Sequence, residues 1–201
     1  MKPSLRLSFA SLAALLFGCE VSDPFPKPTP KQEPSLVLPT ATTVGANTLG
    51  FEIDGRVWVN YGRSCFLFSG GGCYDNVVRV QSGTRRGVRS IIVSADLLTL
   101  QRQESFALSI DTLRGPGTYL AGPPFVTLPP GTAGTGVNGI RLNDARFNRA
   151  YVSRANATRI VLTRVDTVRR IVSGTFDGQL EDGFNPGTFA TIRNGRFDVT
   201  Y

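Results

Sequence analysis

The sequence predicts an all-β domain in which an antiparallel meander forms a β-sandwich or a small barrel. Two dipeptides and the spacing of the apolar segments support this class. Asp54-Gly55 and Asn194-Gly195 each separate two segments rich in β-branched and aromatic residues. Both dipeptides favour a two-residue type I′ turn, because aspartate, asparagine and glycine tolerate its positive φ angles. The segments between them are short and divided by turn residues, as in antiparallel sheets.

The first dipeptide predicts a hairpin between residues 49–53 and 56–59. A two-residue turn sets Phe51 opposite Trp58 and Glu52 opposite Val57. Paired residues share one face of a sheet, and successive residues alternate between the faces. We therefore expect the rings of the first pair to lie together on the core face.

The second dipeptide predicts a hairpin at the end of the chain, between residues 189–193 and 196–201. Its register sets Ile192 opposite Phe197 and directs both, together with Val199, toward the core. The neighbouring residues point the other way. Those expected to face solvent are Arg193, Arg196 and Asp198.

Further strands are expected between the two hairpins. They are 76–81, 88–95, 105–112, 118–121, 140–147, 151–153, 159–165 and 170–180. A helix is predicted over 96–104, where leucines accompany charged residues. The architecture implied is an antiparallel β-sandwich or a small lipocalin-like barrel with at most one short helix.

The first 19 residues have the pattern of a bacterial lipoprotein signal. Lys2 and Arg6 precede an apolar run at 7–17, which Gly18-Cys19 closes. A charged start, a short apolar stretch and a small residue before the cleavage point are typical of secretory signals, and the run is too short to span a bilayer. Cleavage would leave Cys19 at the new N-terminus, where acyl chains such as palmitate anchor the protein to a membrane.

The chain is therefore expected to have three parts. Residues 1–18 are the signal peptide, 19–44 the lipidated cysteine with a tether, and 45–201 a single β domain. Six prolines within 24–39 favour an extended, semi-rigid spacer. We expect an outer membrane lipoprotein that contacts the membrane through the lipid on Cys19, with its domain facing the periplasm or the cell surface.

Cys65 and Cys73 are the cysteines that remain once Cys19 is lipidated. Export beyond the inner membrane favours their oxidation to a disulfide, and the three glycines at 70–72 suit a chain reversal between them. Two cysteines without a histidine do not complete a tetrahedral site, so no metal is expected.

Five apolar residues are candidate ligand contacts. Phe66 and Phe68 lie within the cysteine loop, where they either form an exposed contact tip or pack into the core. The expected variable loop is the stretch 121–139, rich in glycine and proline. Its candidates are Pro123, Pro124 and Phe125.

Histidine is absent from the whole chain, and the only lysines are Lys2, Lys27 and Lys31. Nucleophilic catalysis that depends on histidine or lysine therefore has no base or amine in the domain, and no cofactor is indicated. Carboxylate hydrolysis stays open, because a glycosidase needs two carboxyl groups across a cleft. No spacing singles out such a pair, so we expect a protein that is not an enzyme.

The predicted domain is basic, with 18 arginines against 12 acidic residues. Such a balance can indicate nucleic acid or an anionic polysaccharide. Most of the arginines are scattered along predicted strands without an aromatic stacking motif, so nucleic acid is not an expected partner. The oligomeric state is not defined by these patterns.

Four blocks of the domain resemble uncharacterised lipoproteins of Bacteroidetes that carry a domain of unknown function. The blocks are LGFEIDGRVWV at 49–59, GPGTY at 115–119, VSGTF at 172–176 and NGRFDV at 194–199. The resemblance implies a β fold and an envelope location, and it implies no activity.

Together the patterns predict a membrane-anchored, non-enzymatic binding or structural β-domain of the cell envelope, with a glycan or a protein as partner. A lipocalin-like carrier of a small apolar ligand is the alternative, and it requires an interior cavity of several hundred cubic ångströms. A carboxylate-based glycan hydrolase is a third class, and it requires two facing acids roughly 5 to 9 Å apart.

Overall fold

The computed structural model describes residues 34–66, 72–85, 87–122 and 138–201. Within these ranges every regular element is a β-strand, so the predicted all-β fold is confirmed. None of the described residues belongs to a helix able to cross a bilayer.

The described residues form twelve strands. They are β1 (Thr48–Ile53), β2 (Arg56–Val59), β3 (Arg63–Phe66), β4 (Gly72–Asp75), β5 (Val78–Arg85), β6 (Val88–Leu98), β7 (Gln103–Ile110), β8 (Gly117–Ala121), β9 (Gly139–Asp144), β10 (Arg149–Asp166), β11 (Ile171–Asp182) and β12 (Phe189–Thr200).

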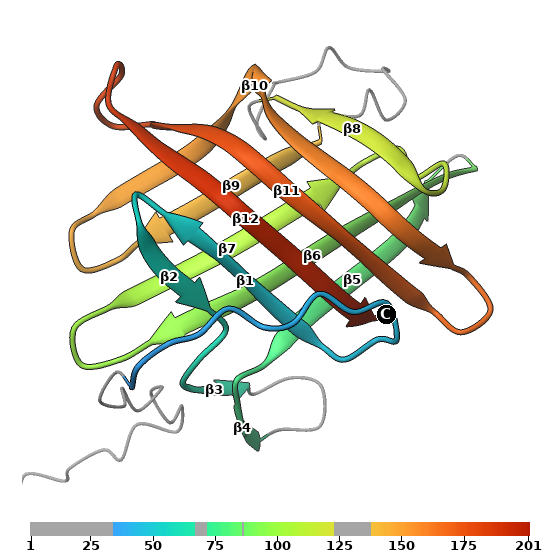
Figure 1. Ribbon diagram of the computed structural model, residues 1–201, viewed down its shortest axis with the longest axis horizontal. Helices are drawn as coiled ribbons and strands as arrows, with labels where there is room; N and C mark the ends of the chain where they lie inside the picture. The colour runs from blue at the N-terminus through green and yellow to red at the C-terminus, as the bar shows by residue number, and fades with distance from the viewer. Residues whose placement is uncertain (1–33, 67–71, 86, 123–137) are drawn as a thin grey trace, which may run out of the picture.

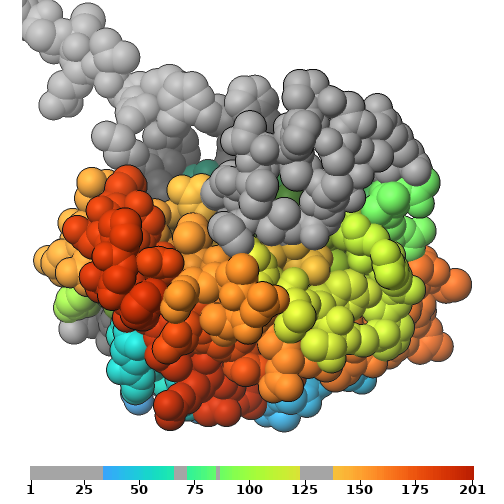
Figure 2. Space-filling model, turned by 90° about the horizontal axis from the view of Figure 1, so that it is seen from above, coloured from blue at the N-terminus to red at the C-terminus, as the bar shows by residue number. Residues whose placement is uncertain are grey.

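One large antiparallel sheet has the strand order β2-β1-β12-β11-β10-β9-β7-β6-β5, and β8 pairs with β10. The sheet curls so that β1, β12, β11 and β10 cross in front of β9, β7, β6 and β5, which gives a half-barrel of two layers (Figure 1). β10 belongs to both layers, because its first residues pair with β9 and its later residues with β8. Figure 2 shows β8 beside β10 along one side of the molecule.

Aromatic rings fill the core between the two layers. Phe51 stacks on Trp58 with ring centroids 4.8 Å apart, and Phe106 from the opposite layer also lies 4.8 Å from Phe51. Phe176 follows, 5.3 Å from Phe106. All four side chains are at most 1% exposed. Truncating a buried ring of this size typically costs about 3 to 5 kcal/mol, so this cluster holds the two layers together.

The first predicted hairpin is confirmed. β1 pairs with β2 in the expected register, with Phe51 opposite Trp58 and the following pair also as predicted. Asp54 has a φ angle of 48° and Gly55 one of 80°. Positive φ at both residues is what a type I′ turn requires.

The second predicted hairpin is wrong. β12 runs without reversal from Phe189 to Thr200, and Asn194 is the extra residue of a β-bulge. A type I′ turn needs positive φ at two successive residues, whereas Asn194, at 53°, is followed by a glycine without one. A Cβ on Gly195 would lie 2.4 Å from the carbonyl oxygen of Phe176, so glycine is needed here for close strand packing and not for a turn.

The burial inferred from that hairpin is right for its apolar residues. Ile192, Phe197 and Val199 are at most 2% exposed, and Arg193 is exposed. The expectation fails at Asp198, which is only 1% exposed. A preceding segment of the chain covers this carboxylate, as described below.

The predicted helix over 96–104 is wrong. β6 continues to Leu98, and β7 begins at Gln103 after a short turn. Burial alternates along β6, with Leu97 fully buried and its neighbours partly exposed. The leucines therefore follow the two-residue period of a strand. The predicted strands 151–153 and 159–165 are likewise parts of the single strand β10.

The β3–β4 hairpin carries the predicted disulfide. Cys65 lies opposite Cys73 in the pairing of the two strands, and their sulfur atoms are bonded. Tyr61 connects this hairpin to the large sheet, because its N–H donates to the carbonyl of Asp96 and its carbonyl accepts the N–H of Leu98. The disulfide thus closes a two-stranded unit that is separate from the large sheet.

Candidate binding groove

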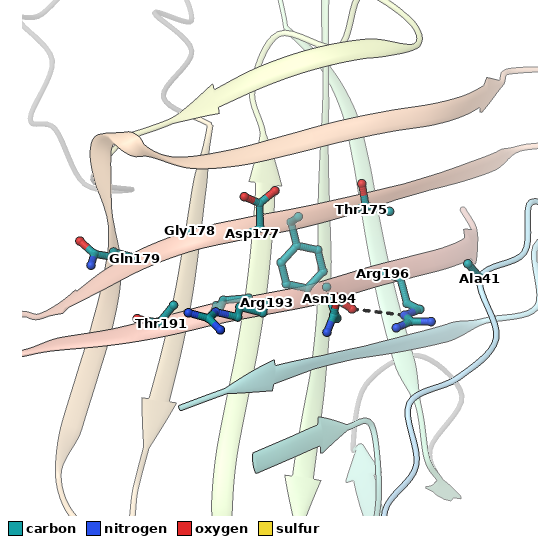
Figure 3. Close-up of a pocket in the computed structure, with 12 residues that line it drawn as sticks. Ala41, Thr175, Asp177, Gly178, Gln179, Thr191, Arg193, Asn194 and Arg196 are labelled. Atoms are coloured by element: carbon teal, nitrogen blue, oxygen red, sulfur yellow. Dashed lines mark hydrogen bonds between the residues drawn. The ribbon is translucent and has the colours of Figure 1, made fainter. Parts of the chain in front are cut away.

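A shallow hollow lies on the outer face of β11 and β12, and we call it the outer groove (Figure 3). Its volume is about 670 Å³. Polar side chains from both strands line it. They are Thr175, Asp177 and Gln179 of β11 and Thr191, Arg193 and Arg196 of β12.

The β-bulge of β12 lies at the centre of the outer groove. Gly178 and Gly195 line the groove there without side chains, and Asn194 is the inserted residue between two regularly paired parts of the strand. A bulge interrupts the ladder and bends the strand locally. The two glycines therefore contribute only backbone at the centre of the groove, and the polar side chains lie around them.

Two guanidinium groups of the outer groove have unused donors. The Arg193 side chain makes no hydrogen bond or ion pair with any described residue, and Arg196 donates from Nε to the carbonyl oxygen of Asn194 at 3.2 Å. Asp177 is already paired with Arg159 at 3.1 Å. The groove thus presents free N–H donors beside a carboxylate that is already neutralised.

Two smaller hollows continue the outer groove along β12. One of about 320 Å³ lies between Arg193 and the turn at Asp54-Gly55. The other, of about 150 Å³, lies between Arg196 and the threonines Thr42 and Thr43. The polar surface therefore extends beyond a single small-molecule pocket, in the direction of the strand.

A segment before β1, residues 42–46, crosses this face, and we call it the strap. Asp198 of β12 holds the strap through its carboxylate. Its Oδ2 atom accepts hydrogen bonds from Thr42 Oγ1 at 2.6 Å and from the N–H groups of Val44 and Ala46 at 2.9 and 3.0 Å. Because the strap covers the carboxylate, Asp198 is buried although it lies on the outer face.

The second oxygen of Asp198 completes the strap contact. Oδ1 accepts hydrogen bonds from the Gly45 N–H at 2.9 Å and from Ser173 Oγ at 2.6 Å. Burial by itself raises the pKa of Asp198, but the hydrogen bonds to its charged form outweigh burial and lower the pKa to about 2. The last residues of the segment predicted as tether, 42–44, are thus bound to the folded domain.

Other carboxylates of the domain hold turns or pair with arginines. Asp182 accepts hydrogen bonds from the Asn185 side chain and the Phe184 N–H, and these bonds lower its pKa. Glu104, which is 2% exposed, forms two contacts with the Arg56 guanidinium at 2.9 and 3.1 Å. Among the described residues no group of histidine, cysteine, aspartate and glutamate side chains is arranged to hold a metal ion.

Most of the predicted contact residues are not near the outer groove or cannot be placed. Phe66 lies in β3, where its backbone pairs with Gly72. Outside the described residues lie Cys19, Phe68, Pro123, Pro124 and Phe125. Sequence reasoning missed Arg193 and Arg196 as site residues, because it placed them across the tip of a hairpin and not along one continuous strand.

Comparison with known proteins gave no match: no family model, no curated protein and no solved structure is similar to this chain. The function must therefore be argued from the groove and from the sequence pattern of the N-terminus.

Proposed function

We propose that this protein is a membrane-tethered, non-enzymatic binding domain of the bacterial envelope and that its outer groove takes a polar glycan. The observation that carries the proposal is the groove, an open hollow with free donors from Arg193 and Arg196. The anchor in this proposal is the lipid on Cys19, followed by the proline-rich spacer.

The lining of the outer groove suits the hydroxyl groups of a sugar chain. Guanidinium, amide and hydroxyl side chains supply the donors and acceptors that such hydroxyl groups need. The adjoining hollows leave room for more than one sugar unit along β12. The two arginines also favour a glycan that carries carboxylate or phosphate groups, because a guanidinium group binds such groups through two parallel hydrogen bonds.

The state of the carboxylates supports binding without catalysis. A glycosidase needs a general acid whose pKa is raised, placed across a cleft from a second carboxyl group. Asp166, Asp182 and Asp198 instead have lowered pKa values, because hydrogen bonds to the charged form outweigh the effect of burial. These carboxylates stabilise turns and the strap.

The packing of the core gives the carrier alternative no support. A carrier of a small apolar ligand needs an interior cavity of several hundred cubic ångströms. In the described part of the interior, the closely packed rings of Phe51, Trp58 and Phe106 occupy the space between the layers.

Cosedimentation with purified envelope polysaccharide tests the glycan proposal. The full chain in detergent should bind, and the double variant Arg193→Ala, Arg196→Ala should bind at least tenfold more weakly. Arg114→Ala is the matched control, because Arg114 is exposed but lies outside the groove, and it should bind like the wild type. If the double variant binds as well as the wild type, the outer groove is not the glycan-binding site. Loss of a copurifying protein, with polysaccharide binding unchanged, would make the partner a protein.

Cell fractionation tests the anchor separately. Cys19→Ser should release the protein from the membrane fraction into the periplasm or the medium, because the acyl chains would have no attachment point. If the variant stays with the membranes, a lipid on Cys19 is not what holds the protein there.

A further inference from the structure

A second polar pocket lies where the two layers of the half-barrel meet without hydrogen bonding, and we call it the seam pocket. Its volume is about 290 Å³. It is bounded by the edge strand β5, the start of β6, the turn between β10 and β11, and the last residue of the chain, whose place is marked C in Figure 1. Its polar side chains are Ser82, Thr84, Arg89, Thr167, Arg170 and Tyr201.

The side chains that line the seam pocket include two arginines and no carboxylate. Neither Arg89 nor Arg170 forms an ion pair with a described residue, whereas arginines such as Arg56 and Arg164 are paired with carboxylates. The Arg170 guanidinium group lies over an aromatic ring, with its central carbon 5.8 Å from the ring centroid of Tyr201. Two arginine side chains at one pocket both attract an anion that enters it.

The backbone fixes the position of Arg170. Its φ angle is 56°, in the left-handed region, and its carbonyl accepts the N–H of Tyr201 at 2.8 Å. Asp166 closes the preceding turn by accepting the N–H groups of Val168 and Arg169. These contacts fix the backbone from which the Arg170 side chain extends toward the pocket.

Tyr201, which borders the pocket, carries a buried polar group whose hydrogen-bonding capacity is unmet. The hydroxyl of Tyr201 is buried and has no hydrogen-bond partner among the described residues. A buried hydroxyl without a partner costs free energy, so such groups are uncommon in folded proteins. The hydroxyl residues Ser82, Thr84 and Thr167 line the pocket itself and supply it with hydrogen-bonding groups.

We propose that the seam pocket binds a phosphate group. A carboxylate has two oxygens and is satisfied by one guanidinium group, whereas a phosphate monoester has three terminal oxygens and can use two guanidinium groups together with hydroxyl donors. The seam pocket supplies that larger set. The site does not depend on the outer groove, since none of its residues lines that groove.

Binding of phosphate probes to the full chain in detergent tests this proposal. Inorganic phosphate and glucose 1-phosphate are titrated at constant ionic strength with chloride as the competing salt, and amide NMR shifts of the pocket residues are followed. Saturable shifts at Thr84 and Arg170 are expected with phosphate and not with chloride. Phosphatidylcholine vesicles with and without phosphatidic acid then show whether a lipid headgroup or a soluble phosphate is the better ligand.

Two variants and one control decide whether the pocket is responsible. Arg170→Asn keeps a residue that tolerates positive φ, and Arg89→Gln keeps a polar side chain. Each should weaken phosphate binding at least tenfold, while Arg114→Ala, at an exposed arginine outside both pockets, should leave it unchanged. Absence of saturable shifts in the wild type would refute the proposal. So would equal weakening by all three variants, because binding would then follow overall charge.

Discussion

Replacing Asp198 by asparagine should release the strap from the domain. The carboxylate accepts five hydrogen bonds, four of them from strap residues and one from Ser173. Asparagine has nearly the same shape but no charge, and its amide N–H₂ group would face N–H donors of the strap. The perturbation therefore removes the charge and leaves the volume almost unchanged.

The expected loss follows from the pKa of Asp198, which falls from 3.8 to about 2 in the folded protein. A fall of nearly two units corresponds to about 2.5 kcal/mol at neutral pH. The misplaced amide donor adds to this, so Asp198→Asn should lose about 3 kcal/mol of unfolding free energy. Asp177→Asn is the control, because Asp177 is about half exposed in its ion pair, and it should change stability by less than about 0.5 kcal/mol.

Denaturant unfolding at several pH values and hydrogen exchange measure the effect. The folded-state pKa is depressed, so the stabilisation is complete above the ordinary pKa and is lost as the pH falls toward about 2. The difference between wild type and Asp198→Asn should thus shrink between about pH 5 and pH 2. The amides of Val44, Gly45 and Ala46 should exchange faster in the variant. A difference independent of pH, or unchanged protection of these amides, would refute the reasoning.

Three further perturbations test the packing. Arg56→Ala leaves Glu104 buried without its partner and should lower the unfolding free energy by about 3 to 5 kcal/mol in a denaturant melt. A loss below about 1 kcal/mol would mean that other groups or water stabilise the Glu104 carboxylate. Gly195→Ala should lower the unfolding free energy by at least about 2 kcal/mol. Gly83→Ala is the control, because a Cβ there would make ordinary contacts, and it should cost under about 1 kcal/mol. Equal losses would contradict the close packing of β12 on β11. Reducing the Cys65–Cys73 disulfide should lower the unfolding free energy by roughly 2.6 kcal/mol through loop entropy. Alkylation of both cysteines in the denatured, unreduced protein would contradict the disulfide.

Local turn chemistry predicts the fold where the chain reverses within two residues. At Asp54-Gly55 both residues tolerate positive φ, the flanking segments pair directly, and the register follows with no further information. At 96–104 the same reasoning fails, because closely spaced leucines are compatible with a helix or a strand over so few residues. The pairing of β6 with β7 on one side and β5 on the other decides for the strand.

The strap could not be predicted from local sequence at all. Thr42 and Asp198 are separated by 156 positions, and nothing near either residue indicates the other. The proline-rich composition predicts a spacer up to residue 44. In the structure, the last residues of this segment are instead bound by the Asp198 carboxylate of β12. Long-range side-chain contacts of this kind require the tertiary structure.

The outer groove could not be predicted from the sequence, because a bulge and a hairpin at Asn194-Gly195 produce the same burial pattern. In a hairpin with a two-residue turn, Ile192 and Phe197 face each other and share the core face. In a continuous strand they would face opposite sides, but the extra residue in the bulge shifts the alternation by one and returns both to the core. The same shift puts Arg193 and Arg196 together on the outer face. The bulge is thus the feature that brings two arginines of β12 into the lining of the outer groove.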